Sequence, residues 1–240
     1  ARMASAVELA ALAEVNLALA EATEPARAAA LNRVFHARLL DAARNRFLIS
    51  SFEQSRWADS MIAVAGLSVG ASLLNVCALT GGRNFRIADP DVLGPTNLNR
   101  LAGSAGDIGI SKATLAPRRV LEADPYCRVE AFDAGVTAET ADAFLGGDGR
   151  CADVVLEEID SIAMKVEIRK QARTRRIPVV MVTDNGDDVI VDVERYDLDP
   201  AYPLFHGRAG AIDDLSVTEL TDPANRLRLA GAIVGDDVTP

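Results

Sequence analysis

Short apolar runs alternate with helix-like segments along most of the chain, and this alternation predicts the secondary structure. From residue 60 onward, runs rich in Val, Ile, Phe and Ala are separated by stretches whose apolar residues recur at helical spacing. The predicted strands are Met61–Ala65, Asn84–Ala88, Arg128–Phe132, Val154–Glu157, Val179–Thr183 and Val189–Val193. The predicted helices are Ala71–Leu79, Lys112–Glu122, Ala138–Leu145 and Ile162–Arg175. The alternation indicates βαβ units, and therefore an α/β fold with a mostly parallel sheet and helices on both faces.

The two ends of the chain differ from its middle. Residues 1–58 are expected to form an N-terminal helical segment, because their apolar positions recur mostly at helical spacing. Residues 59–200 are the predicted α/β domain. Residues 201–240 carry weaker signals, with Pro and Gly around one or two short helices. They are expected to form a C-terminal extension that packs on the sheet or leads to a further, missing domain.

Composition and charge argue against several classes of protein. Charged residues make up 25% and apolar residues 49% of the 240 positions, which argues against global disorder. The net charge of −10 argues against non-specific nucleic-acid binding, which favours a basic surface.

The uncharged stretch Met61–Leu79 is interrupted by Gly and Ser. A strand, a glycine turn and a buried helix therefore explain it better than a membrane helix does.

The cysteines and histidines predict neither a disulfide framework nor a zinc site. The three cysteines, Cys77, Cys127 and Cys151, are odd in number and include no C-x-x-C pair. A reducing, cytoplasmic location fits this usage. The chain has only two histidines, so a histidine-rich metal site is not expected.

A glycine turn follows the first predicted strand and opens the first predicted helix. Its residues run Gly66-Leu67-Ser68-Val69-Gly70-Ala71, so Ser68 replaces the second glycine of a G-x-G-x-x-G pattern. Gly66, Ser68 and Gly70 are candidate phosphate-binding positions, because glycine lets the backbone approach an anion at a helix N-terminus. Such turns also serve plain strand–helix packing, so this motif alone leaves both interpretations open.

Acidic and basic residues follow the second predicted strand. Asp89 and Asp91 come directly after it, at the spacing where a carboxylate accepts hydrogen bonds from ribose hydroxyls. Further along, Asn97, Arg100 and Lys112 are placed to bind phosphates near the carboxyl edge of the sheet. Together with the glycine turn, Asp89 and Asp91 favour a Rossmann-like nucleotide site. The alternative for each cation alone is an ordinary solvated surface charge.

A cluster of carboxylates follows the fourth predicted strand. The run Asp153-Val154-Val155-Leu156-Glu157-Glu158-Ile159-Asp160 ends a buried strand in acidic residues. Ligands in such folds bind beyond the carboxyl ends of the strands, and a carboxylate there suits Mg²⁺ held partly by phosphate oxygens. Acidic residues at a helix start are also common without any ligand.

In this order, the motifs resemble the ThiF/MoeB family, which includes the activating enzymes for ubiquitin-like proteins. The similar stretch covers about 150 residues, from Arg44 to about Glu194. It contains the glycine turn, Asp89-Pro90-Asp91, Asn97-Leu98-Asn99-Arg100, Asp107-Ile108-Gly109-Ile110-Ser111-Lys112, Ala123-Asp124-Pro125 and Ile159-Asp160-Ser161. The resemblance implies an ATP-binding domain over residues 59–200 and ATP-dependent adenylation of a carboxylate, with ATP and Mg²⁺ bound.

The resemblance also implies roles for individual residues. Asp89 corresponds to the ribose ligand and Asp160 to the magnesium-linked aspartate, while Asn97, Arg100 and Lys112 correspond to a triphosphate clamp. Arg46 is similar to an arginine that reaches the γ-phosphate across a homodimer; the alternative is an ordinary helix-face arginine. The implied partner is a carboxylate substrate, with the C-terminus of a ubiquitin-like protein as one open choice.

Departures from the family pattern keep other functions open. The glycine turn is poorer in glycine than usual, and no cysteine lies beyond Cys151, where the family's thiol usually falls. A nucleotide-binding or scaffold module without catalysis is one alternative, and an NAD- or FAD-binding oxidoreductase domain is another. The acidic segment Thr183–Asp188 is interpreted as an Asn-Gly hairpin turn rather than as part of an acceptor site.

Overall fold

The computed structural model describes residues 13–15, 17–18, 21–27, 30–31, 34, 48–147, 149–185 and 188–234, with only the backbone at 184, 185 and 188. The chain divides into two compact units, one of Ala1–Asp59 with Leu79–Gly82 and one of Ser60–Ala78 with Arg83–Pro240. The predicted boundaries at residues 58 and 200 stay predictions. Arg44 to Arg46 lie outside the described residues, and so does the role expected of Arg46.

The first unit contains helix α3, Ser51–Asp59, whose start is set by local hydrogen bonds. The backbone N–H of Ser50 donates to Glu53 Oε2 at 2.7 Å, and the backbone N–H of Glu53 donates to Ser50 Oγ at 3.2 Å. This reciprocal capping satisfies donors that the first turn of a helix leaves free. Within the same unit, Gln54 Nε2 and Trp57 Nε1 donate to Thr80, which fixes α3 against the segment Leu79–Gly82.

The second unit is built on one six-stranded sheet in the order β3-β2-β1-β4-β5-β6. The strands are β1 Met61–Ala65, β2 Asn84–Ala88, β3 Arg128–Phe132, β4 Val154–Glu157, β5 Val179–Asn185 and β6 Asp188–Glu194. The first five strands run parallel, and β6 pairs antiparallel with β5 at the edge. The predicted Rossmann-like, mostly parallel sheet is therefore confirmed.

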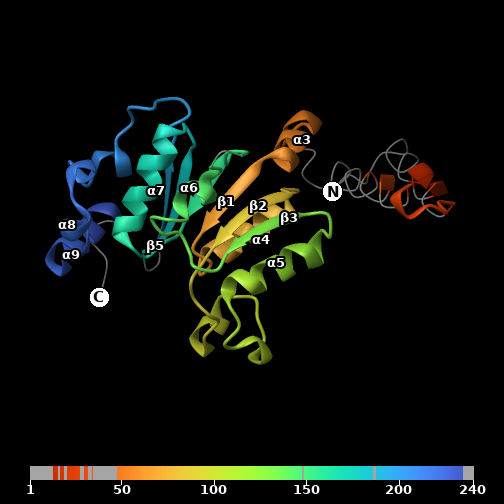
Figure 1. Cartoon of the computed structure of the whole chain (residues 1–240), viewed down its shortest axis with the longest axis horizontal. Helices are drawn as coiled ribbons and strands as arrows, with labels where there is room; N and C mark the ends of the chain where they lie inside the picture. The colour runs from red at the N-terminus through yellow and green to blue at the C-terminus, as the bar shows by residue number, and fades with distance from the viewer. Residues whose placement is uncertain are drawn as a thin grey trace. The chain divides into compact units, whose positions relative to one another are not determined.

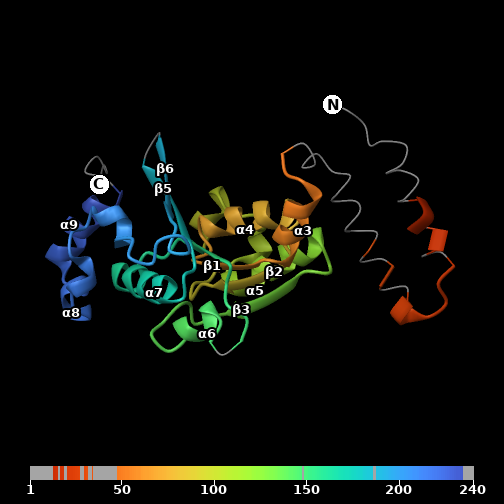
Figure 2. The ribbon, with the colours of Figure 1, turned by 90° about the horizontal axis from the view of Figure 1, so that it is seen from above.

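Helices cover both faces of this sheet. They are α4 Gly70–Leu79, α5 Lys112–Ala123, α6 Ala141–Leu145 and α7 Ile162–Thr174. Figure 1 shows the strands side by side, and Figure 2 shows α4 on one side of the sheet with α6 and α7 on the other. Right-handed crossovers from β1 to β2 and from β2 to β3 put α5 on the face that α4 covers. The strand order reverses direction between β1 and β4, which is where such folds bind ligands.

Two of the apolar clusters that stabilise the second unit lie among its described residues. One lies between the sheet and α6 and α7, and its buried members include Ala63, Phe144, Val155, Ile168, Val179 and Tyr196. The other joins α7 and β5 to the C-terminal segments, and its buried members include Val166, Met181, Phe205, Ile212, Leu220 and Leu229. Each fully buried Val, Ile, Leu, Met or Phe in these clusters contributes about 1.5–3 kcal/mol by leaving water.

The residues after β6 pack on the α/β core through the second cluster. They form the short turns η4 Leu204–Gly207 and η5 Ile212–Asp214 and the helices α8 Val217–Thr221 and α9 Pro223–Val234. The described residues up to 234 thus pack on α7 and β5, while the predicted role of residues 201–240 as an extension stays a prediction. No helix among the described residues is both long and apolar enough to cross a membrane.

Most element bounds match the sequence prediction, and the largest difference is in α6. The predicted helix begins at Ala138, whereas α6 begins at Ala141. The cause is a turn in which the backbone N–H of Thr137 donates to Thr140 Oγ1 at 2.8 Å and Thr140 Oγ1 donates to the Gly135 carbonyl at 2.9 Å. Hydroxyl side chains that bind nearby backbone in this way compete with helix formation.

The hairpin predicted near residue 186 is confirmed by the antiparallel pairing of β5 with β6, which brings Asn185 opposite Asp188. Gly186 and Asp187, between the strands, lie outside the described residues. In α5, Pro117 lies inside the helix.

Candidate functional site

The turn between β1 and α4 requires glycine at its first position. Gly66 has a φ of 89° and donates its N–H to the Ala88 carbonyl at 2.8 Å. A Cβ atom there would lie 2.3 Å from the carbonyl oxygen of Glu158. At Gly70 an added Cβ would come within 3.0 Å of Val64 Cγ1. The two glycines therefore let the ends of β1, β2 and β4 meet closely, at the point where the strand order reverses.

Asp89 braces this turn from the end of β2. Its Oδ2 accepts the N–H of Leu67 at 2.6 Å, and its Oδ1 accepts the N–H of Asp91 at 2.8 Å. The side chain is buried, yet each carboxylate oxygen has a second lone pair that can accept another bond. The structure thus gives Asp89 a clear structural role, while ribose binding stays a prediction.

Lys112, at the start of α5, is held between two acidic side chains. Its Nζ lies 2.8 Å from Asp91 Oδ2 and 3.6 Å from Asp89 Oδ1. Lys112 and Asp89 are buried, whereas Asp91 is exposed. Two carboxylates therefore already neutralise the Lys112 ammonium, and its predicted contact with phosphate stays a prediction.

The loop after β2 forms the 3₁₀ turn η2, Pro95–Asn99, and this turn places Arg100. The side-chain Oδ1 of Asn97 accepts the Gly94 N–H at 2.8 Å, and the Asn97 carbonyl accepts the Arg100 N–H at 3.0 Å. Asn97 thus fixes the loop conformation from within. Its predicted contact with phosphate stays a prediction.

Arg100 connects this loop to the glycine turn. Its Nε donates to Ser68 Oγ at 3.0 Å, and one terminal nitrogen donates to Asn99 Oδ1 at 3.1 Å. The guanidinium group is exposed and has no ion pair among the described residues. It is therefore a positive charge beside the N-terminal turn of α4, where an anion is favoured.

Two cavities meet at Arg100. The smaller, of about 140 Å³, lies between α4 and α5 and is lined by residues that include Leu67, Leu74, Leu93, Arg100, Lys112 and Leu115. The larger, of about 860 Å³, lies beyond the ends of β1, β4 and β5, and its lining includes Ser68, Arg100, Glu158, Asp160, Lys165 and Arg226. Two cations of the predicted clamp therefore line one cavity, and Arg100 shares the other with Asp160.

Asp160 is exposed on the wall of the larger cavity, just before α7. No group of three or more His, Cys, Asp or Glu side chains lies together as a metal site within the described part of the chain. Magnesium bound to a nucleotide, however, needs only one or two protein carboxylates, because phosphate oxygens and waters complete its shell. Asp160 fits that limited requirement.

Glu158 is a half-buried carboxyl group in the same cavity. It accepts the N–H of Val182 at 2.8 Å. Loss of solvent around the side chain raises the pKa of Glu158 from 4.5 to about 7, although the Val182 hydrogen bond opposes this shift. The neighbouring charge of Glu157 adds to the rise. A large fraction of Glu158 is therefore neutral near pH 7, so it repels an anion less than Asp160 does.

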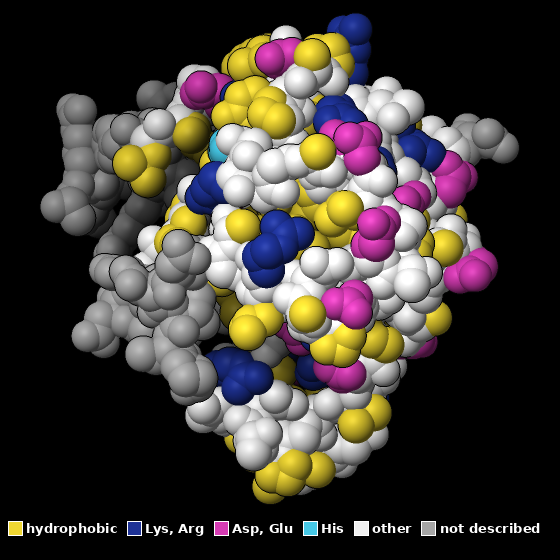
Figure 3. Space-filling model, turned by 90° about the vertical axis from the view of Figure 1, so that its left-hand side faces the viewer, with side chains coloured by type: hydrophobic (Ala, Val, Ile, Leu, Met, Phe, Trp, Pro, Cys, Tyr) yellow, Lys and Arg dark blue, Asp and Glu magenta, His cyan; other side chains and the backbone are white. Residues whose placement is uncertain are grey.

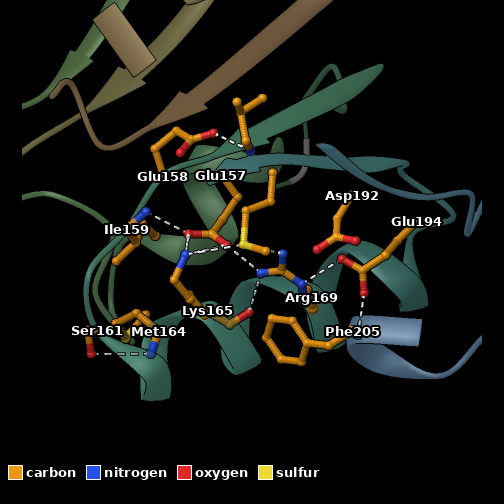
Figure 4. A network of polar contacts seen from close by, with 12 residues as sticks. Glu157, Glu158, Ile159, Ser161, Met164, Lys165, Arg169, Asp192, Glu194 and Phe205 are labelled. Carbon is orange, nitrogen blue, oxygen red and sulfur yellow. Dashed lines mark hydrogen bonds and ion pairs between the residues drawn. The ribbon is translucent and has the colours of Figure 1, made fainter. Parts of the chain in front are cut away.

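Behind the cavity wall lies a buried ionic network that the sequence did not predict. Glu157 Oε1 accepts the Ile159 N–H at 2.6 Å and a bond from Lys165 Nζ at 3.1 Å, and its Oε2 is ion-paired with Arg169. Figure 4 shows these groups converging between β4 and α7. Burial alone would raise the pKa of Glu157, but the charges of Arg169 and Lys165 hold it below its ordinary value. Glu157 thus fixes Ile159, the residue that precedes Asp160.

Arg169 extends this network to β6 and η4. It is completely buried, and its Nε donates to Glu194 Oε2 at 2.6 Å. Glu194 Oε1 in turn accepts the hydroxyl of Tyr196 and the N–H of Phe205, each at 2.7 Å. The guanidinium carbon also lies 4.1 Å from the centre of the Phe205 ring. One arginine therefore joins the strand that carries the acidic cluster to the C-terminal part of the unit.

The predicted residues fall into three places. Gly66, Ser68, Gly70, Asp89, Asp91, Asn97, Arg100 and Lys112 lie around the ends of β1 and β2, and Asp160 lies at the end of β4. Arg46 lies outside the described residues. A cavity with cations and acids at the reversal point of a parallel sheet defines the class of a nucleotide-binding α/β protein.

Comparison with known proteins gives the family. The sequence model of the ThiF family matches residues 42–186, which is more than half of the 240 residues. The chain therefore belongs to the ThiF family, as its motifs indicate.

Individual relatives are similar over part of their length. The chain is 42% identical over 190 residues to uncharacterized protein MT1398 of Mycobacterium tuberculosis (strain CDC 1551 / Oshkosh), covering 79% of this chain and 26% of that protein. It is 28% identical over 135 residues to the tRNA threonylcarbamoyladenosine dehydratase of Escherichia coli (strain K12), covering 55% and 49%. It is 27% identical over 107 residues to the probable molybdopterin-synthase adenylyltransferase of Porphyra purpurea, covering 44% and 27%.

Solved structures of related proteins are also similar to this chain over part of their length. The crystal structure of the E. coli dehydratase in complex with ATP matches with a TM-score of 0.55 and 26% identity, over 61% of this chain and 60% of that one. The chain spans between about a quarter and about half of the length of the three curated relatives named above.

Proposed function

We propose that this chain binds ATP and magnesium and adenylates a carboxylate substrate. The observation that carries the proposal is the position of Arg100, which is bonded to Ser68 of the glycine turn and lines both cavities. Lys112 lines one cavity and Asp160 the other. A triphosphate seated beside Arg100 would have Arg100 and Lys112 as cations and Asp160 as a carboxylate for its metal ion. The related E. coli dehydratase crystallises in complex with ATP, which supports the choice of nucleotide.

The chemistry needs alignment and charge neutralisation rather than a protein nucleophile. An oxygen of the substrate carboxylate attacks the α-phosphorus, the bond from that phosphorus to the bridging oxygen breaks, and pyrophosphate leaves with the electron pair. Arg100 and Lys112 would stabilise the charge that develops on the phosphates, while Asp89 would hold the ribose. Asp160 would hold magnesium, which neutralises phosphate charge and orients the leaving group.

The finer parts of the proposal concern partners. The acid is a small carboxylate, a peptide or the C-terminus of a ubiquitin-like protein, and the larger cavity is open enough to receive an extended group. Arg46 from a second copy of the chain would complete the phosphate site in a homodimer. The expected oligomer can be measured directly by sedimentation of the 240-residue chain.

ATP–pyrophosphate exchange tests the reaction. Labelled pyrophosphate is supplied with ATP and a panel of carboxylic acids, with and without Mg²⁺. Arg100→Ala, Lys112→Ala and Asp160→Asn should each slow exchange by about 10²–10³-fold, because each removes a preorganised charge contact. Arg118→Ala and Asp214→Asn, exposed positions that line neither cavity, are the controls and should retain activity. Full exchange in the Arg100 and Asp160 variants would refute their assigned roles.

A second candidate is a nucleotide-binding module that catalyses nothing. It is favoured by the pairing of Lys112 with Asp89 and Asp91, which already neutralises the ammonium. Tight ATP binding without exchange for any acid would favour this candidate over the adenylation reaction.

A further inference from the structure

Helix α9 forms one wall of the larger cavity, and that wall combines a cation with apolar side chains. The residues of α9 that line it are Pro223, Arg226, Leu227, Ala230, Ile233 and Val234. Figure 3 looks onto the side of the molecule that carries α8 and α9, where apolar and basic side chains are interspersed. The lining also includes the polar groups of the proposed phosphate site, namely Ser68, Arg100 and Asp160. The cavity therefore combines these polar groups with an apolar stretch of α9.

The cations of this cavity differ in how far they are already engaged. Arg100 donates to Ser68, and Lys165 is paired with the buried Glu157. Arg226 is exposed, and its guanidinium has no ion pair with any side chain in the described part of the chain. It is thus the cation of the α9 wall that remains available to an anion from outside, and a guanidinium group can grip a carboxylate through two parallel hydrogen bonds.

The apolar part of the wall is a stripe of side chains on α9. Leu227 is 81% exposed, and Ala230 and Val234 are half-buried on the same helix. The positions 227, 230 and 234 follow helical spacing, so their side chains line one stripe. A cavity of about 860 Å³ falls in the usual range for small-molecule sites, where apolar walls bind the body of a ligand and a few polar groups orient it.

We infer that α9 is the recognition wall for the acid: Arg226 binds the carboxylate of the substrate, and Leu227, Ala230 and Val234 contact an aliphatic group beside it. The substrate class is accordingly a monocarboxylic acid with an aliphatic side chain next to the carboxylate, such as a peptide that ends in leucine or valine. This inference rests on the proposed adenylation reaction, because it assigns the acceptor to the same cavity as Asp160.

The test compares two acids and four variants in ATP–pyrophosphate exchange on the 240-residue chain. N-acetyl-L-leucine is the aliphatic probe and N-acetylglycine is the truncated probe. Arg226→Ala should raise the KM for N-acetyl-L-leucine by about ten- to a hundredfold without changing the KM for ATP, and Arg226→Lys should restore part of the loss. Leu227→Gln should raise the KM for N-acetyl-L-leucine by about threefold and leave that for N-acetylglycine unchanged. Arg228→Ala, on the same helix but outside the cavity, is the matched control.

The outcomes separate this inference from the proposed function. If the two acids support exchange equally well, the recognition role of α9 is overturned while adenylation stays intact. The same follows if Arg226→Ala leaves the KM for N-acetyl-L-leucine unchanged. If no acid supports exchange, the proposed function fails, and calorimetry with N-acetyl-L-leucine and α,β-methylene-ATP decides the inference. Binding that is lost in Arg226→Ala then supports the site on α9, and absence of binding to the unsubstituted chain overturns it.

Discussion

At the scale of single residues, Glu158 is a carboxyl group whose charge depends on pH near neutrality. It lies at the end of β4, accepts a hydrogen bond from Val182 and has a pKa raised to about 7 by loss of solvent. The folded chain therefore keeps this proton over a pH range in which the unfolded chain has released it. By linkage, the stability contributed by the protonated form is fully present below the ordinary pKa and is lost as pH rises through the folded pKa.

This linkage gives a prediction for Glu158→Gln. The difference in unfolding free energy between the variant and the unsubstituted chain should shift in favour of the variant as pH rises from about 4.5 to about 7, and stay constant above that. The shift should amount to about 1–2 kcal/mol, because a half-buried group is partly screened by solvent. Urea unfolding of both proteins at a series of pH values measures it. A difference that does not depend on pH would show that Glu158 titrates normally.

At the scale of elements, a buried arginine links α7 to two strands of the sheet. Arg169 pairs with Glu157 on β4 and with Glu194 on β6, and all three side chains are buried. Removing one partner of a buried network leaves uncompensated charge, whereas removing an exposed pair costs little. The network also supports the Asp160 turn, because Glu157 accepts the Ile159 N–H.

Arg169→Met should therefore lower the unfolding free energy by about 3–5 kcal/mol. Arg173→Met is the matched control on the same helix, since among the described residues Arg173 pairs only with the half-buried Asp213, across 2.9 Å. It should lose at most about 1 kcal/mol. Chemical denaturation of the two variants gives both values, and equal losses would mean that burial of the network contributes nothing of its own.

The elements differ in how well the sequence predicts them. The strands β1 to β4 match their predicted bounds because each mostly apolar run is followed by a glycine or an acidic residue. The predicted start of α6 was wrong, because the side chains of Thr137 and Thr140 form a turn that the spacing of apolar residues does not reveal. The pairing of Arg169 with Glu194 spans 25 positions and depends on β6 running antiparallel. A run of charges in the sequence does not reveal which of them will meet in the core.

At the scale of the whole second unit, the candidate site is assembled from segments far apart in the chain. The turn at Ser68, the loop at Arg100, the acid at Asp160 and the helix α9 line the larger cavity together. The first three carry recognisable motifs and were predicted as site residues. The residues of α9 were not predicted as site residues, because the sequence after residue 200 shows only weak periodicity and its packing depends on the second apolar cluster.

The assembly predicts how ATP binding should couple to stability. A ligand that binds only the folded state stabilises it by about 2.7 kcal/mol at a hundred times its Kd, which corresponds to a rise in Tm of about 5–10 °C for a unit of this size. Scanning calorimetry with and without ATP and Mg²⁺ measures this shift. Arg100 is exposed, so Arg100→Ala should leave the Tm of the ligand-free chain nearly unchanged and remove most of the shift. Arg118→Ala should retain it, and a full shift in Arg100→Ala would place the nucleotide away from the junction of the two cavities.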